Sequence, residues 1–351
     1  MIETIAASDT LEQAYAWYTS TRQDAHHNHE VWHLRRNWAQ IRPRIQAQLH
    51  AGTYQFAPCR ACQVAGTWQS VWSAPDAVVL KAMALVLTAR LSPHLSHDCY
   101  HLAGRGGQKG CVMRIKHAIR RYRYVCRSDV DSYYATINHQ VLLAQIRERI
   151  PDPTVCSLIA RLLDRLDDVN AELHRITVGI TKGSPLSPLL GAIYLDAMDR
   201  AIGDYCRPRG LRYYRYMDDW LILCHTRHQL RAIVRLMNTQ LNRVQQTKHP
   251  FKTYIGRLRL TGIDFLGYCI GAATQGLGVA AQTWTNHFAK CTQLYEQHAS
   301  PEAAAAYVRR WLIWLRSGVD IDLSTTLTRL SNTLAVAASL HSYLDNQRST
   351  N

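Results

Sequence analysis

The sequence lacks three features that would each indicate a particular class of protein. The most apolar stretch, Val78–Ala89, is interrupted by Lys81 and falls short of the roughly 18 apolar residues that a transmembrane helix needs. Cysteine is scarce, with 10 residues in 351, which excludes a disulfide scaffold. Residues 1–10 lack the basic region of a secretory signal. We therefore expect a cytoplasmic protein with reduced thiols and no membrane partner.

Acidic residues are also in short supply. The chain has 26 Asp and Glu against 41 Lys and Arg, a net charge of +15, which favours a polyanionic partner such as nucleic acid. No acidic residue lies between Asp98 and Asp129, and this stretch carries eight cations: Arg105, Lys109, Arg114, Lys116, Arg120, Arg121, Arg123 and Arg127. We expect it to contact nucleic acid, chiefly through Arg105, Lys109, Arg114, Arg120 and Arg121. The alternative is an ordinary solvated helix face.

The spacing of apolar residues predicts a mixture of helices and short strands. Helical spacing occurs at about residues 9–50, 76–92, 140–149, 153–168, 185–201, 230–241 and 284–345. Strand-like runs occur at 124–130, at 211–224 as a hairpin, and at 254–281. The glycines from Gly104 to Gly110 predict a flexible loop. The mixture indicates an α+β fold.

One group of cysteines and histidines has two interpretations. Cys59 and Cys62 form a CxxC pair, and a second group of candidate ligands follows at His94, His97, Cys99 and His101. A structural zinc site is one interpretation. The second group lacks a clean paired spacing, so reduced thiols acting as small hydrophobic residues are the favoured interpretation.

The strongest chemical signal is a pair of adjacent carboxylates. Asp218 and Asp219 stand at the tip of the predicted hairpin, and Asp129 ends another predicted strand. Like charges held close together are costly unless a cation neutralises them. Mg²⁺ is a hard ion that prefers oxygen ligands, and two such ions serve phosphoryl transfer. An Asp-rich turn without any catalytic role is the alternative.

Taken together, several segments of the sequence resemble the blocks of reverse transcriptases. The resemblance is to the group II intron-like and unclassified stand-alone bacterial branch, which includes proteins of antiphage defence. The segments follow the family order: Asp129–Tyr134, Gly183–Leu190, Tyr216–Asp219, Lys252–Arg257 and Phe265–Tyr268. They span about residues 129–268.

The resemblance implies a right-hand polymerase with fingers, palm and thumb. Residues 1–128 would form an N-terminal extension and fingers, and residues 129–274 the palm, with finger-like helices at about 140–176. Residues 275–351 would form a helical thumb. The implied reaction is RNA-directed DNA synthesis, in which dNTPs are joined to a primer 3′-hydroxyl with two Mg²⁺ ions, or Mn²⁺ in their place.

The resemblance also assigns roles to individual residues. Asp129, Asp218 and Asp219 would be the catalytic carboxylates, and the backbone of Val130 would join them as a metal ligand. The nucleotide would contact Tyr134, Lys182, Gly183 and Lys252. The nucleic acid would contact Ser184, Pro185, Gly267, Arg309 and Arg310. Lys182 departs from the family pattern, which has Gln at this position, and this puts the ordinary substrate geometry in doubt.

The implied partners are an RNA template, a DNA primer and product, and dNTPs, with a dedicated non-coding RNA as one source of the template. Two other functions stay open. One is template-independent or self-primed DNA synthesis, suggested by Lys182. The other is a non-catalytic, maturase-like RNA-binding protein, suggested by the basic segment before Asp129. The oligomeric state and the biological role, defence or retroelement mobility, stay open as well.

Overall fold

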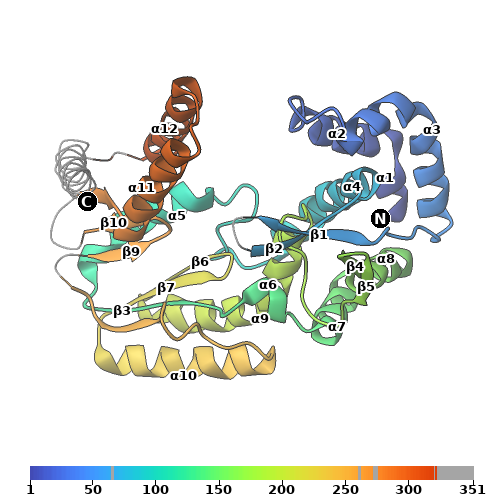
Figure 1. The fold of residues 1–351 in the computed structure, drawn as a ribbon. Helices are drawn as coiled ribbons and strands as arrows, with labels where there is room; N and C mark the ends of the chain where they lie inside the picture. Colours follow the sequence, from blue (N-terminus) through green and yellow to red (C-terminus); the bar gives the residue numbers. More distant parts are fainter. Residues whose placement is uncertain (65–66, 260–261, 272–275, 320, 322–351) are drawn as a thin grey trace, which may run out of the picture. The chain divides into compact units, whose positions relative to one another are not determined.

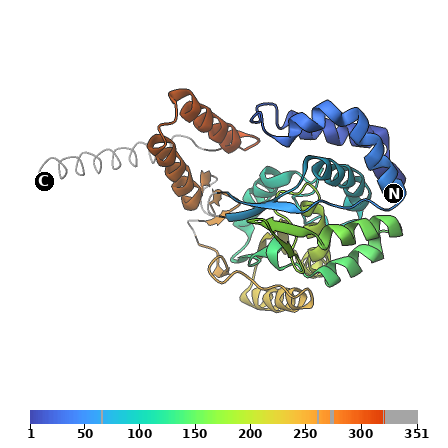
Figure 2. The same ribbon diagram turned by 45° about the vertical axis from the view of Figure 1, so that its right-hand side comes forward.

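The computed structural model describes residues 1–64, 67–259, 262–271, 276–319 and 321 (Figures 1 and 2). Contacts divide the chain into two units. The first contains residues 1–107, 126–222 and 226–255, and the second contains residues 108–125, 223–225 and 256 onward. This division differs from the predicted limits at 128/129 and 274/275, which stay a prediction.

The N-terminal part of the first unit is helical. It contains α1 (Ile2–Ala6), α2 (Ser8–Ser20), α3 (Glu30–His50) and α4 (Ala74–Leu91), which confirms the helices expected in these regions. The Ser73 hydroxyl caps α4 by accepting a hydrogen bond from the Asp76 amide. Because α4 is apolar on nearly all sides, it is buried along most of its length against α2 and its neighbours.

A mixed sheet follows in the same unit, with strand order β2-β1-β4-β5. Its strands are β1 (Cys59–Val64), β2 (Thr67–Val71), β4 (Leu166–Val169) and β5 (Glu172–Arg175). Here the predicted helix at 153–168 is wrong at its end. Helix α8 (Pro153–Leu163) stops because the next residues pair in parallel with β1 and antiparallel with β5. This tertiary pairing overrides the helical spacing of the apolar residues.

The second sheet of the first unit carries the hairpin. Its order is β6-β7-β3-β8, with β6 (Arg212–Tyr216), β7 (Asp219–Cys224), β3 (Tyr124–Asp129) and β8 (Tyr254–Arg257). The remaining helices of this region are α6 (Tyr133–Thr136), α7 (His139–Arg149), α9 (Ser187–Cys206) and α10 (Arg227–Arg243). Helix α9 contacts β6 and α10 packs on α9, so both lie on one side of this sheet (Figure 1). The predicted hairpin is confirmed.

The second unit contains a three-stranded sheet and helices. Its elements are α5 (Gly107–Ala118), β9 (Ile263–Phe265), β10 (Tyr268–Ile270), β11 (Leu277–Val279), α11 (Ala281–Glu296) and α12 (Pro301–Arg316). The predicted loop at 104–110 is wrong in its second half, because α5 begins at Gly107. The helix expected at 323–344 lies outside the described residues.

Three short 3₁₀ helices complete the described chain: η1 (Ser92–His94), η2 (Ile119–Arg121) and η3 (Arg207–Arg209). Among the described helices, none combines the length and the apolar character needed to cross a membrane. Helices together with largely antiparallel sheets confirm the α+β class.

Candidate active site

The three predicted carboxylates come together at one end of the hairpin sheet. Asp129 is the last residue of β3, and Asp218 and Asp219 form the turn and the start of β7, which is the neighbour of β3 in the sheet. The backbone amide of Val130 donates to the carbonyl of Asp218 at 3.3 Å, which ties the two segments directly. Segments 89 positions apart in the sequence (218 − 129) thus form one acidic cluster.

Burial and mutual repulsion make this cluster costly when it is ionised. Burial, then the charge of Asp129, raises the pKa of Asp218 to about 6. Burial, followed by the charges of Asp129 and Asp218, raises the pKa of Asp219 to about 7. The nearby cations Arg127 and Lys252 oppose the rise for Asp219 without cancelling it. The cluster therefore holds negative charge that the described side chains do not fully compensate.

Lys252 is the cation closest to the cluster. Its Nζ donates to Oδ2 of Asp129 at 2.5 Å. The lysine is held there by its neighbour Thr253, whose hydroxyl lies 2.7 Å from the hydroxyl of Ser128 on β3. The amide of His249 also donates to the backbone carbonyl of Asp129 at 2.8 Å. Lys252 thus occupies one oxygen of the predicted metal ligand.

The chemistry of the cluster fits a divalent cation. The second oxygen of Asp129, Oδ1, is buried and has no hydrogen-bond partner among the described residues. An orphaned buried carboxylate oxygen beside two carboxyls of raised pKa is what a bound cation would satisfy. The described residues contain no group of three or more Asp, Glu, His or Cys side chains already arranged around a metal position. A cation bound by both oxygens of Asp129 would replace the Lys252 Nζ at Oδ2.

The turn is held from behind by two side chains, His101 and the buried Arg215. Met217, the residue before Asp218, has φ of 56°, a left-handed conformation that costs a non-glycine residue roughly 1–2 kcal/mol. Its amide donates to Nδ1 of His101 at 3.0 Å, and its carbonyl accepts from Nη1 of Arg215 at 2.7 Å. Both backbone polar groups of this strained residue are therefore bound by side chains.

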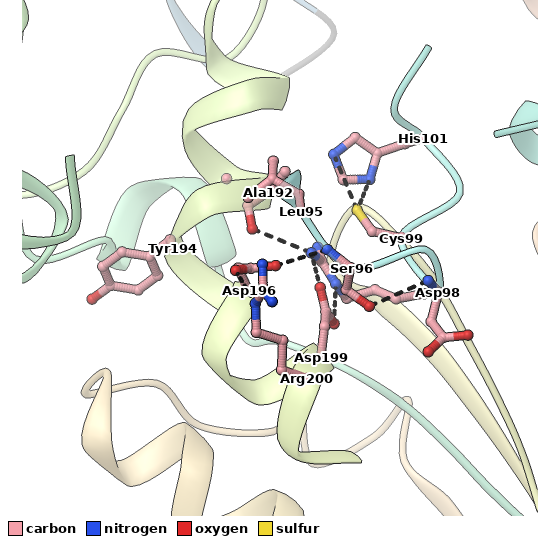
Figure 3. Close-up of polar contacts among 12 residues, drawn as sticks. Leu95, Ser96, Asp98, Cys99, His101, Ala192, Tyr194, Asp196, Asp199 and Arg200 are labelled. Atoms are coloured by element: carbon pink, nitrogen blue, oxygen red, sulfur yellow. Dashed lines mark hydrogen bonds and ion pairs between the residues drawn. The ribbon is translucent and has the colours of Figure 1, made fainter. Parts of the chain in front are cut away.

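Arg215 is fixed in turn by α9. Its guanidinium is fully buried and forms a two-pronged pair with Asp199, with Nε to Oδ1 at 2.7 Å and Nη2 to Oδ2 at 2.5 Å. The hydroxyl of Tyr213 also donates to Asp199 at 2.7 Å. One turn earlier on the same helix, the buried Asp196 accepts from the Ser96 amide (2.8 Å) and pairs with Arg200 (Figure 3). Asp196 also pairs with Arg149. Hydrogen bonds and ion pairs thus fix Arg215 and α9 behind the hairpin.

The predicted nucleotide-side residues lie in the same unit. The hydroxyl of Tyr134 donates to the sulfur of Met217 at 3.4 Å, so the tyrosine contacts the turn directly. Gly183 has φ of +85°, which explains why a glycine stands there, whereas Lys182 is exposed. Ser184 is buried, and its hydroxyl accepts from the Leu186 amide at 3.3 Å. Pro185 lines an open pocket of about 480 Å³ beside α4.

Two predicted nucleic-acid contacts are engaged within the protein. The guanidinium of Arg105 donates to the carbonyls of Ser92, Leu95 and Ser96, around η1. In the second unit, Nζ of Lys109 donates to the Tyr268 hydroxyl and the Trp314 carbonyl, and burial lowers the pKa of the lysine to about 8. Arg114, Arg120, Arg121, Arg309 and Arg310 are exposed, and Gly267 has φ of +83°. Their contacts with nucleic acid stay predictions.

The structure does not support the zinc interpretation. Cys59 is buried on β1, where it pairs with Asp167 of β4. No metal-holding group of Cys and His occurs in the described ranges. The ring nitrogens of His101 contact backbone groups, with Nε2 3.0 Å from the Pro188 carbonyl, and Nδ1 also lies 3.4 Å from the sulfur of Cys99.

Sequence reasoning missed the supporting residues His101, Asp199 and Arg215. A signal was present for the last two: an arginine inside an apolar strand and an aspartate inside an apolar helix are rarely buried unless they are paired. His101 gave no such signal, because its partners are backbone groups that only the fold brings near.

The site thus combines a hairpin turn with adjacent aspartates and a third aspartate on the neighbouring strand. The family model described as reverse transcriptase (RNA-dependent DNA polymerase) matches residues 70–270, which is more than half of the chain. The chain belongs to this reverse transcriptase family.

Among these relatives is the group II intron-encoded protein LtrA of Lactococcus lactis subsp. cremoris. It is 26% identical over 168 residues, which cover 45% of this chain and 28% of LtrA. The COX1/OXI3 intron 2 protein of Saccharomyces cerevisiae is 23% identical over 163 residues, covering 45% of this chain and 19% of that protein. This chain therefore matches less than a third of the length of either relative.

A solved structure supports the fold. A telomerase from Candida albicans, in complex with a fragment of telomeric RNA, superposes with a TM-score of 0.52 at 10% identity, over 72% of this chain and 52% of the telomerase. At this identity the likeness concerns the fold alone. It agrees with the predicted right-hand polymerase fold.

Proposed function

We propose that the chain is an RNA-directed DNA polymerase that joins dNTPs to the 3′-hydroxyl of a primer on an RNA template. The observation that carries the proposal is the incompletely compensated acidic cluster of Asp129, Asp218 and Asp219 in a protein of net charge +15. Holding three carboxylates together is costly, and a protein that only binds RNA gains nothing from them.

Two Mg²⁺ ions suit this cluster, and Mn²⁺ is the alternative. Asp129 and Asp218 would hold both ions, with Asp219 and the backbone of Val130 beside them. When bound, the ions lower the pKa of the attacking hydroxyl and stabilise the departing pyrophosphate. The orphaned Oδ1 of Asp129 supports this assignment.

The chain's own residues position the substrates. Lys252, once released from Asp129, would lie beside the pyrophosphate as a charge partner or proton donor. Tyr134, which contacts Met217, would lie beneath the sugar and exclude a 2′-hydroxyl by steric clash. Gly183 and the exposed Lys182 would contact the nucleotide. Ser184 and Pro185, near the start of α9, would contact the template.

A primer-extension assay tests the proposal. The wild-type protein should extend a DNA primer on an RNA template with Mg²⁺ and dNTPs, and Asp218→Asn or Asp129→Asn should abolish extension. Asp24→Asn, at an exposed site in the loop before α3, is the matched control and should remain active. Full activity in either active-site variant would refute the metal assignment.

The same assay separates the alternative functions. A product formed equally well without RNA would indicate template-independent or self-primed synthesis. RNA binding with no product under any condition would indicate a maturase-like binder. A product whose sequence copies the supplied RNA excludes both.

The biological template is proposed to be a dedicated non-coding RNA, in antiphage defence, or a retroelement RNA. Sequencing the RNA and DNA that co-purify with the protein, expressed with its native flanking sequence, separates these roles. A single enriched non-coding RNA supports the first, and intron or element RNA supports the second. Absence of bound RNA argues against a dedicated partner.

A further inference from the structure

The imidazole of His101 bridges two segments of the candidate active site. Its Nδ1 accepts from the amide of Met217, in the catalytic turn, at 3.0 Å. Its Nε2 lies 3.0 Å from the carbonyl of Pro188, in the segment that contains Gly183 and begins α9. The ring packs edge-on against Tyr216, with centroids 6.0 Å apart.

The partners fix which nitrogen carries the proton. An amide N–H can only donate, and a carbonyl can only accept, so the proton must sit on Nε2. An imidazolium would place a second N–H against the Met217 amide, and a side chain without polar atoms would remove both the acceptor of the Met217 amide and the donor to the Pro188 carbonyl. The site therefore requires one donor and one acceptor at a set separation.

We propose that His101 is a positioning residue that sets the catalytic turn relative to the Gly183–Pro188 segment. His101 binds the amide of Met217, the residue that leads into Asp218, and Arg215 binds the carbonyl of Met217 from the other side. The carboxylates and the nucleotide-side segment thus keep a fixed separation. This role rests on the polymerase function proposed above, although the bridge itself does not.

Three variants test the role of His101. His101→Phe removes both hydrogen bonds, and His101→Gln keeps one acceptor and one donor. His97→Phe, at an exposed histidine nearby, is the matched control. We expect His101→Phe to lower kcat by roughly 10- to 100-fold, with the KM for dNTP within about threefold of the wild type. His101→Gln should recover most of the loss, and His97→Phe should behave as the wild type.

Hydrogen exchange gives a readout that does not depend on catalysis. Peptides that contain Met217 should lose amide protection in His101→Phe and keep it in His101→Gln and His97→Phe. The proposal is overturned if His101→Phe keeps the kcat and the amide protection of the wild type. It is also overturned if His101→Phe and His101→Gln lose kcat and amide protection equally. If His101→Phe does not fold, ¹⁵N NMR of the wild type decides, because a proton on Nδ1 overturns the assignment. An inactive wild type with a protected Met217 would refute the polymerase function but not the bridge.

A different observation concerns the exposed side of α10. The helix packs on α9 through Leu230, Ile233 and Met237. Its opposite side carries Arg227, Arg231 and Arg235, all exposed at intervals of four residues, which we call the arginine face. No Asp or Glu occurs anywhere between Asp219 and Asp264 in the sequence.

The arginine face differs from three other exposed arginines of the same unit, Arg60, Arg175 and Arg207. Arg60, Arg175 and Arg207 each pair with an acidic side chain, whereas the three arginines of the arginine face form no ion pair within the described parts of the chain. Like charges four residues apart on a helix repel each other. Such repulsion is relieved when an external polyanion binds.

We infer that the arginine face binds the phosphate backbone of a nucleic-acid segment. The helix rises about 6 Å between successive arginines, and the cations therefore form a row that can follow a strand of phosphates. The partner is recognised by charge, so either RNA or DNA can supply the phosphates.

The test compares two triple variants. Arg227→Gln/Arg231→Gln/Arg235→Gln removes the arginine face, and Arg60→Gln/Arg175→Gln/Arg207→Gln removes the same charge from paired positions. Affinity for RNA and DNA duplexes of one sequence is measured across salt concentrations, without dNTPs. We expect the first variant to lose roughly tenfold or more in affinity. The slope of its log affinity against log salt concentration should become less steep by about 2–3.

The two duplexes identify the source of the phosphates. Equal loss with both supports recognition of any phosphate backbone, and loss with RNA alone supports RNA as the partner. Unchanged binding of both duplexes would overturn the inference. An equal loss in the paired-arginine variant would overturn it as well, because net charge rather than the arginine face would then be responsible.

Discussion

Asp219 provides a quantitative test of the acidic cluster. Burial and the neighbouring carboxylates raise its pKa from the ordinary 3.8 to about 7. A shift of about 3 units corresponds to roughly 4 kcal/mol, and contact of the side chain with solvent reduces this to about 2 kcal/mol. At pH 8 the metal-free protein therefore carries a carboxylate that destabilises the folded state.

The sign of the pH dependence follows from the direction of the shift. The folded-state pKa lies above that of the unfolded chain, so between about pH 4 and 7 the folded protein binds the proton more tightly. The contribution of Asp219 to the stability of the metal-free protein therefore falls as the pH rises through this range and is constant above it. Asp219→Asn removes this pH-dependent loss.

We therefore expect Asp219→Asn to be more stable than the wild type at pH 8 in EDTA. A gain of about 2 kcal/mol corresponds to a rise in Tm of roughly 4–8 °C for a unit of this size. The gain should disappear near pH 4, and added Mg²⁺ should raise the Tm of the wild type more than that of the variant. Differential scanning fluorimetry across pH measures all three effects.

The melting temperature of Asp219→Asn in EDTA can also refute this explanation. If Asp219→Asn melts below the wild type in EDTA at pH 8, the carboxylate stabilises the fold and the cluster is an ordinary hydrogen-bonded turn. A difference that does not change between pH 4 and pH 8 would show that the effect is not due to ionisation. Asp24→Asn, at an exposed position, should shift the Tm little at either pH.

Three further predictions concern residues around the turn. Arg215→Met leaves the buried carboxylate of Asp199 unpaired and should cost about 3–5 kcal/mol in urea unfolding; a loss below 1 kcal/mol would contradict the pairing. Tyr134→Ala should raise the incorporation of rNTPs relative to dNTPs in single-nucleotide extension, and an unchanged ratio would exclude the steric role. Gly183→Ala should lower the unfolding free energy by about 1 kcal/mol through backbone strain alone, because no atom lies within 4 Å of the added Cβ; an unchanged urea midpoint would argue against strain there.

The sequence predicted best those elements that depend only on residues close together in the chain. The hairpin around Asp218 and Asp219 was predictable, because apolar strands flank a short acidic turn. Helix α3 was predictable from the spacing of its apolar residues. Strand β4 was not, because its residues share the helical spacing of α8 and become a strand only through pairing with β1.

The same limit applies to the site. The resemblance named the residues that we propose to face substrate, since these form short sequence blocks. It could not name His101, whose role depends on backbone atoms 87 and 116 positions away. The charge pattern before Asp129 placed Arg105 against nucleic acid, whereas the fold directs this side chain to the carbonyls around η1.

The two groups of charges at the end of the hairpin serve opposite purposes. Behind the turn, Arg215 and Asp199 neutralise each other with nearly every polar atom satisfied, which makes that side rigid. In front of it, Asp129, Asp218 and Asp219 retain an excess of negative charge and an orphaned oxygen. If the carboxylates in front of the turn were fully compensated, they would have no affinity for a cation. If the side chains behind the turn were unpaired, the turn would relax away from the strained conformation of Met217. A rigid support beneath an incompletely compensated cluster is therefore the arrangement that a metal-dependent polymerase site requires.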